Sequence, residues 1–147
     1  MKRPTLALSI GLLAGFFSVS IAGAHCEIPC GIYDDPLRIN LVAEHATTIE
    51  KSMKQIVDLG KADQTNHNQL VRWVSNKEAH ATEVQHIVSQ YFMTQRIKPD
   101  QDKYAEKLAV LHKMLIAAMK CKQTTDLSHV GTLRSLLKAF ETLYLDH

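Results

Sequence analysis

The chain has 147 residues, a formal net charge of +2 at pH 7, and 46% hydrophobic but only 6% aromatic residues. This length is enough for one domain with its own core. The near-neutral charge, with no run of basic residues, gives no indication of a surface that binds nucleic acid.

Residues 1–24 have the layout of a secretory signal peptide. Lys2 and Arg3 precede an apolar run over 6–21, and Ala22-Gly23-Ala24 forms a small-residue cleavage site. The run is shorter than the roughly 20 residues of a membrane span, although a retained anchor is the alternative. We expect signal peptidase or a maturation protease to leave a soluble protein, residues 25–147, in a periplasm, outside the cell or in an organelle lumen. Because the leader's only charged residues are Lys2 and Arg3, its removal lowers the formal charge from +2 to 0.

The mature chain is predicted to begin with a short arm, HCEIPCGIYDD, over residues 25–35. Pro29 and Gly31 interrupt it, and it shows no helical periodicity. Cys26 and Cys30 could form a disulfide, since exported proteins are usually oxidised. Such a bridge would close a very small loop and would stabilise the fold little.

The alternative for this arm is a metal site. Cys26 and Cys30 offer two thiolates, and His25 offers an imidazole and, after cleavage, an α-amine with a pKa near 8. The peptide nitrogen of Cys26 lies between that amine and the first sulfur, so a metal could bind both nitrogens and both sulfurs in one plane. Planar coordination favours nickel(II) or copper(II) over tetrahedral zinc. Cleavage would then create one of the ligands.

Residues 36–147 are predicted to fold as four helices, because apolar residues recur at spacings of three and four. The first is expected over 35–59 and the second over 66–92. A third, capped by Asp100, ends before the polar connection at 121–129, and a fourth covers 128–145. The predicted buried positions are Ile39, Val42, Ala46, Ile49, Met53 and Ile56; Leu70, Val74, Lys77, Ala81, Val84, Val88 and Tyr91; Tyr104, Leu108, Leu111, Leu115 and Ala118; and Val130, Leu133, Leu137, Phe140 and Tyr144.

Four helices of similar length with short connections predict an all-α, antiparallel up-down bundle. Lys77 is the one polar member of the predicted apolar stripes. Other charged residues are expected on solvated faces, namely Lys51, Lys54, Glu78, Lys103 and Lys107. Cys121 is expected to be a thiol buried in the bundle or at the edge of a loop, with intermolecular pairing as the alternative.

The arm resembles the H-C-x-x-P-C-G-x-Y hook of the nickel-containing superoxide dismutases, and SQYF followed by KP near the second helix is similar to another landmark of that family. The resemblance implies that nickel, one ion per subunit, alternates between Ni(II) and Ni(III) while superoxide is converted to oxygen and hydrogen peroxide. It implies that Cys26 and Cys30 are ligands in the plane, and that His25 supplies the amine and an axial imidazole. It also implies a homohexamer and a cis peptide bond at Pro29.

Two tyrosines are candidates for catalytic roles. Tyr33, three residues after Cys30, matches the family tyrosine that lines the substrate entrance and orders water beside the nickel. Tyr91 is the candidate for a second one, with a core-edge residue as the alternative. Some family members hold the axial imidazole with a glutamate in the first helix, but here that region reads Asn40 and Leu41, with no acid before Glu44.

Two other functions compete with this assignment. A non-catalytic nickel or copper carrier would share the N-terminal amine, amide and histidine ligands of the enzyme but would not need the two thiolates or Tyr33. A di-metal carboxylate bundle would use Glu-x-x-His motifs. Only one copy occurs, from Glu83 to His86, so His80 and His86 are expected at the surface or in subunit contacts.

Overall fold

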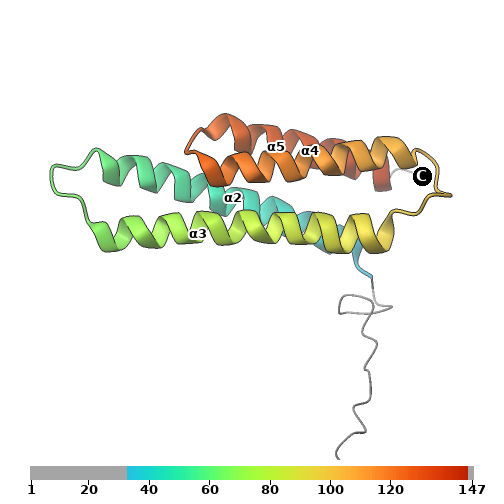
Figure 1. The fold of residues 1–147 in the computed structure, drawn as a ribbon, viewed down its shortest axis with the longest axis horizontal. Helices are drawn as coiled ribbons and strands as arrows, with labels where there is room; N and C mark the ends of the chain where they lie inside the picture. The colour runs from blue at the N-terminus through green and yellow to red at the C-terminus, as the bar shows by residue number, and fades with distance from the viewer. Residues whose placement is uncertain (1–32, 146–147) are drawn as a thin grey trace, which may run out of the picture.

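The computed structural model describes residues 33–145, which form four helical rods packed antiparallel (Figure 1). This confirms the predicted all-α four-helix bundle. The elements are α2 (Asp35–Gly60), α3 (His67–His86), which continues into the π-helix η2 (Ile87–Arg96), α4 (Tyr104–Gln123) and α5 (Leu127–Leu145). Within 33–145, no helix is long and apolar enough to cross a bilayer. The predicted leader and most of the arm lie outside the described residues.

Side-chain caps begin the first two helices. The carboxylate of Asp34 accepts a hydrogen bond from the amide of Leu37 (2.9 Å), and the side chain of Asn66 accepts one from the amide of Gln69 (3.1 Å). Each cap satisfies a backbone donor that has no partner within its helix. The predicted cap at Asp100 is wrong. α4 begins at Tyr104, after Lys103 adopts a left-handed conformation with φ 53°.

The second helical rod extends to Arg96, four residues beyond its predicted end at Phe92. Its last ten residues form a π-helix, in which the amide of Ile97 donates to the carbonyl of Phe92 (2.9 Å), five residues earlier. The helix ends at Arg96, three residues before Pro99, which disfavours helical geometry in the residue that precedes it.

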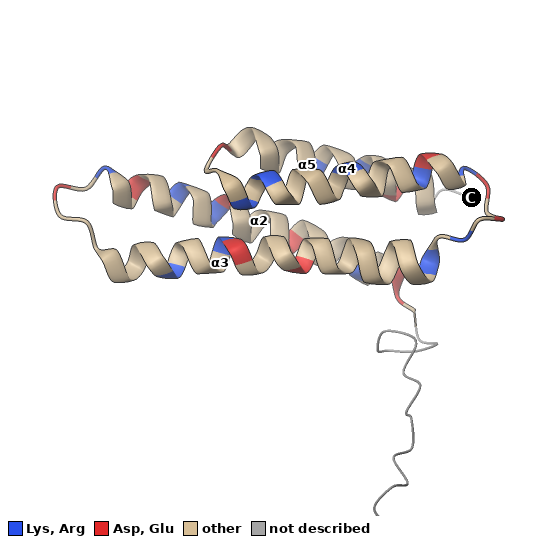
Figure 2. Ribbon diagram, viewed as in Figure 1, with Lys and Arg blue, Asp and Glu red and all other residues tan. Residues whose placement is uncertain are grey.

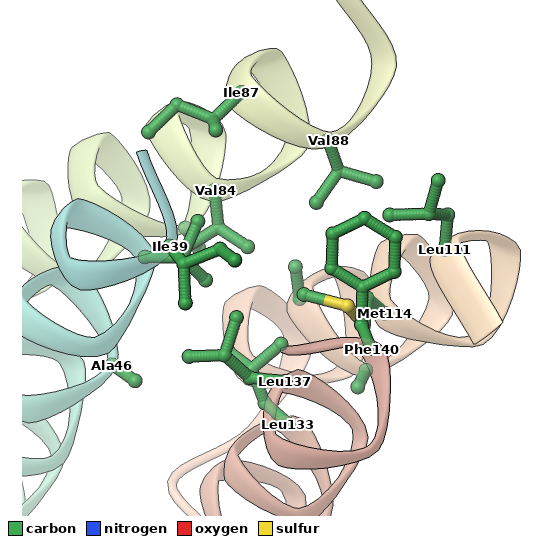
Figure 3. Packing of buried hydrophobic residues seen from close by; sticks show 14 of the residues in the cluster. Ile39, Ala46, Val84, Ile87, Val88, Leu111, Met114, Leu133, Leu137 and Phe140 are labelled. Atoms are coloured by element: carbon green, nitrogen blue, oxygen red, sulfur yellow. The ribbon is translucent and has the colours of Figure 1, made fainter. Parts of the chain in front are cut away.

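One hydrophobic core fills the space between the four rods. Figure 3 shows side chains from all of them pointing toward one another. Phe92 and Phe140 pack edge to face with 4.9 Å between ring centroids, and Phe140 stacks on Tyr144. The buried hydrophobic residues include Ile39, Val42, Ala46, Ile49, Met53, Ala81, Val84, Val88, Leu111, Met114, Val130, Leu133 and Leu137. Charged residues are spread along the rods rather than gathered by sign (Figure 2).

Several predicted exposures are wrong. Val74, predicted to be buried, is 39% exposed. The α2–α3 hairpin extends past the connection between α4 and α5 (Figure 1). Lys107 is buried rather than solvated, and its ammonium lies 5.7 Å from the centroid of the Tyr144 ring.

The predictions for Lys77 and Cys121 agree with the structure. Lys77 is buried in its stripe, and its ammonium donates to the carbonyls of Cys121 (2.8 Å) and Lys122 at the end of α4. Cys121 is a buried thiol. Burial raises its pKa to about 11, although the nearby charge of Lys77 opposes that effect.

Candidate functional site

The two candidate tyrosines lie together at the end of the bundle from which the arm departs. The rings of Tyr33 and Tyr91 meet edge to face with 6.0 Å between centroids. Tyr33 is 40% exposed and Tyr91 only 4%. Tyr33 immediately precedes the cap of α2, whereas Tyr91 comes from η2. The fold therefore joins residues that are 58 positions apart into one aromatic wall.

Behind this wall, the carboxylate of Asp35 receives hydrogen bonds from three side chains. The hydroxyl of Tyr91 donates to Oδ1 (2.6 Å), and that of Tyr144 donates to Oδ2 (2.9 Å). The guanidinium of Arg96 contacts both oxygens, through Nε to Oδ1 (2.9 Å) and Nη2 to Oδ2 (2.7 Å). We call Asp35, Tyr91, Arg96 and Tyr144 the Asp35 node. It ties the start of α2 to η2 and to the end of α5.

Burial and hydrogen bonding act in opposite directions on the acid of the node. Burial raises the pKa of Asp35, but the hydrogen bonds from Arg96, Tyr91 and Tyr144 outweigh it and hold the pKa below its usual value. Burial, followed by the bond to Asp35, raises the pKa of Tyr91 above its usual range and that of Tyr144 to about 12. Both tyrosines are therefore neutral hydroxyl donors at physiological pH.

The π-helix explains how Tyr91 and Arg96 both reach Asp35. In an α-helix, residues five apart point about 140° away from each other, since each residue turns the helix by about 100°. Hydrogen bonding between residues five apart brings such side chains closer to the same face. The side chain of Thr94 and the amide of Ile97 both bond to carbonyls five residues earlier. The local widening thus supplies the geometry of the node.

Cations cover the faces of the aromatic rings. The guanidinium carbon of Arg96 lies 4.3 Å from the centroid of Tyr33, and that of Arg38 lies 4.9 Å from the centroid of Tyr91. A cleft of about 350 Å³ opens beside the node, lined by Asp35, Arg96, Gln101, Asp102, Lys107, Tyr144 and Leu145. Arg96 is paired with Asp35, and Arg38 places a second cation beside the two tyrosines.

The predicted metal ligands His25, Cys26 and Cys30 lie outside the described residues. Within 33–145, no group of three or more His, Cys, Asp or Glu side chains could hold a metal ion. The bundle therefore shows no di-metal carboxylate site in this range. The donors of the arm suit nickel by their chemistry, because thiolate sulfur and nitrogen ligands stabilise its higher oxidation state.

The sequence singles out Tyr33 and Tyr91 as candidates, and the structure brings them into contact, but the sequence does not indicate the Asp35 node beside them. Asp35 was assigned only to the start of a helix, and Tyr144 only to the core. The sequence signal that could have pointed to the node is the position of Asp35, two residues after Tyr33. Nothing local identifies Arg96 or Tyr144 as its partners, which lie 61 and 109 residues away.

Comparison with known proteins identifies the family. Residues 20–147 match the family model described as nickel-containing superoxide dismutase, and this span includes the HCEIPCGIY arm and the whole bundle. No curated protein and no solved structure matched the chain. The family implies an oxidoreductase that uses nickel and acts on superoxide. Because the match covers most of the sequence, the chain belongs to the nickel-containing superoxide dismutase family.

Proposed function

We propose that the mature chain, residues 25–147, is a superoxide dismutase whose nickel is held by the arm at its N-terminus. The structural observation that carries the proposal is the contact of Tyr33 with Tyr91, because Tyr33 follows Cys30 by only three residues. Any centre held by the arm is thus tethered beside this aromatic wall. The reaction consumes two superoxide ions and two protons and yields one oxygen molecule and one hydrogen peroxide molecule.

The arm supplies the ligands that this chemistry requires. The thiolates of Cys26 and Cys30, the amine and imidazole of His25 and the peptide nitrogen of Cys26 would hold the nickel. Bound nickel would supply a one-electron redox couple. The anionic donors would lower its reduction potential into the range where superoxide can both reduce and oxidise the metal. The amine exists only after the leader has been removed, so we propose that cleavage precedes assembly of the site.

The described residues beside the arm have complementary roles. Tyr33 is the more exposed of the two tyrosines and is suited to order water at the entrance, whereas Tyr91 is fixed by its bond to Asp35 (2.6 Å). Arg38 attracts an anionic substrate toward this end of the bundle.

Replacing Arg38 by Gln should slow the reaction and weaken its dependence on ionic strength. If the rate depended on ionic strength as before, Arg38 would not be the residue that attracts the substrate.

The first experiment compares superoxide decay with protein that starts at His25 and protein that starts at Ala24. Both are refolded under reducing conditions and loaded with nickel. Fast decay from the His25 form alone is expected, since Ala24 converts the amine into an amide. An active Ala24 form would contradict the role of cleavage. Bound nickel without decay in either form would favour the carrier instead.

Substitutions in the arm separate its ligands. Cys26→Ser and Cys30→Ser should each abolish activity and the thiolate-to-nickel bands in the visible spectrum, because a neutral hydroxyl cannot replace an anionic sulfur. Cys121→Ser is the matched control, since its thiol is buried in the bundle, and it should keep both activity and spectrum. His25→Gln should keep nickel but slow turnover. Full activity in either Cys26→Ser or Cys30→Ser would refute the ligand assignment.

Export and assembly complete the proposal. Residues 1–24 direct the chain out of the compartment of synthesis, and the mature subunits form a hexamer, as the family resemblance implies. Sedimentation of the mature protein tests the assembly, and a particle smaller than six subunits would contradict it. Fractionation of producing cells, combined with N-terminal sequencing, tests the export and the cut before His25.

A further inference from the structure

Two histidines from neighbouring helices contact each other far from the Asp35 node. His45 lies on α2 and His80 on α3, and their Nδ1 atoms are 2.8 Å apart. The rings are tilted by 57° with 5.0 Å between centroids, and both side chains are half-buried. His45 is ten residues after Asp35, which places it about 15 Å further along α2. The pair is therefore separate from the node.

The spacing of the two nitrogens fits adjacent ligands on one metal ion. Metal–imidazole bonds are about 2.0–2.1 Å long, so two such bonds separate their nitrogens by about 2.9 Å at the right angle of planar copper or nickel and by about 3.3 Å at the tetrahedral angle of zinc. Imidazole is a common ligand for copper, nickel and zinc. Two histidines on antiparallel helices are held in place by the packing of those helices (Figure 1), so little order is lost on binding. The ring whose Nδ1 carries the proton would shift to its Nε2–H tautomer, and the hydrogen bond between the rings would give way to two bonds to the cation.

The charged groups around the pair also favour a cation. Burial and then the proximity of His80 lower the pKa of His45, while Glu83 and Glu44 act in the opposite direction. His45 is therefore mostly neutral at pH 7, with a lone pair available for a metal. Glu83 follows His80 by three residues and thus lies on the same side of α3. No lysine or arginine is among the groups that influence His45.

We propose that His45 and His80 form an accessory binding site for a divalent transition-metal cation, copper, nickel or zinc, with water molecules as the further ligands. The site holds fewer protein ligands than a structural metal centre, in keeping with the absence of any group of three or more candidate ligands over 33–145. It does not depend on the arm or on dismutase activity.

Zinc titration of protein with a disabled arm tests this site. The background is the mature chain with Cys26→Ser and Cys30→Ser, in which zinc binding is measured by calorimetry. We expect one equivalent of zinc that disappears when His45 or His80 is replaced by Gln. His112→Gln is the matched control, because His112 is exposed on α4, and it should keep that equivalent.

Nuclear magnetic resonance of the histidine side chains gives a second measurement that needs no substitution in the pair. Zinc should shift the ring resonances of His45 and His80 together, and those of His112 should stay in place. Equal zinc binding by the His45→Gln, His80→Gln and His112→Gln proteins would overturn the proposal. So would ring shifts that leave His45 and His80 unaffected. Neither result bears on superoxide decay, which is measured with the arm intact.

Discussion

Replacing Asp35 by Asn should destabilise the bundle strongly. Asparagine keeps the size of the side chain and one acceptor oxygen, but it removes the negative charge and places an amide donor opposite other donors. Asp35 now accepts from Tyr91, Tyr144 and Arg96. The one remaining oxygen can still accept from Arg96 and from one tyrosine, so the other tyrosine loses its acceptor.

The magnitude follows from the exposure of the partners. The two tyrosines are 4% and 7% exposed, so the hydroxyl that loses its acceptor gains little from water. A hydrogen bond to a charged group contributes about 1.5–3 kcal/mol. The side chain of Arg96 is 28% exposed, so water offsets part of its loss. We expect the free energy of unfolding to fall by about 2–4 kcal/mol, and the melting temperature by about 8–16 °C.

Chemical denaturation at fixed protein concentration measures the difference, and its pH dependence isolates the charge. The folded-state pKa of Asp35 is lowered, so its contribution is complete above the unfolded-state pKa of about 3.9 and is lost as the pH falls through the folded-state value. The gap between the two proteins should be constant from about pH 5 to 8 and shrink below about pH 4. Asp63→Asn, in the exposed loop after α2, should cost almost nothing. A gap under about 1 kcal/mol at pH 7 would refute the reasoning.

Three further predictions concern the bundle. Phe140→Ala should cost about 3–5 kcal/mol in urea unfolding because it empties a fully buried ring site; a loss under about 1 kcal/mol would mean that the core collapses around it. Lys77→Met should cost about 1–3 kcal/mol by the same assay, since two carbonyls at the end of α4 lose their donor. An unchanged midpoint would show that desolvation of the ammonium cancels those bonds. Cys121 should resist a thiol reagent at pH 8 in the Cys26→Ser/Cys30→Ser protein until it unfolds, and fast labelling of the folded chain would contradict its burial.

The sequence predicted α2 well and α4 less well, for a physical reason. In α2 the apolar residues follow a single stripe, and Ile39, Val42 and Ala46 are all buried as predicted. In α4 the run LAVLHKMLIAAM is apolar on several sides, so more than one stripe satisfies the same spacing. The helix uses the stripe that contains Lys107 and Leu111, and Tyr104 and Leu108 are only partly buried.

The candidate site was predictable only where its signal is local. The arm and Tyr33 form a contiguous motif, so they could be read without knowledge of the fold. The partners of Asp35 and the contact of His45 with His80 depend on which helices become neighbours. Their separations along the chain run from 35 to 109 residues. The π-helix that turns Arg96 toward Asp35 likewise has no counterpart in the spacing of apolar residues.

The long separations within the Asp35 node also bear on the kinetics of folding. The bond between Tyr144 and Asp35 closes a loop of 109 residues, so it can form only after the other helices have gathered. Loop-closure entropy delays contacts of such long separation, so we expect the node to be largely unformed in the folding transition state. Asp35→Asn should therefore leave the folding rate almost unchanged and accelerate unfolding instead. The node therefore acts mainly on the unfolding rate of the bundle. That rate sets how long Tyr33 and Tyr91 stay in contact.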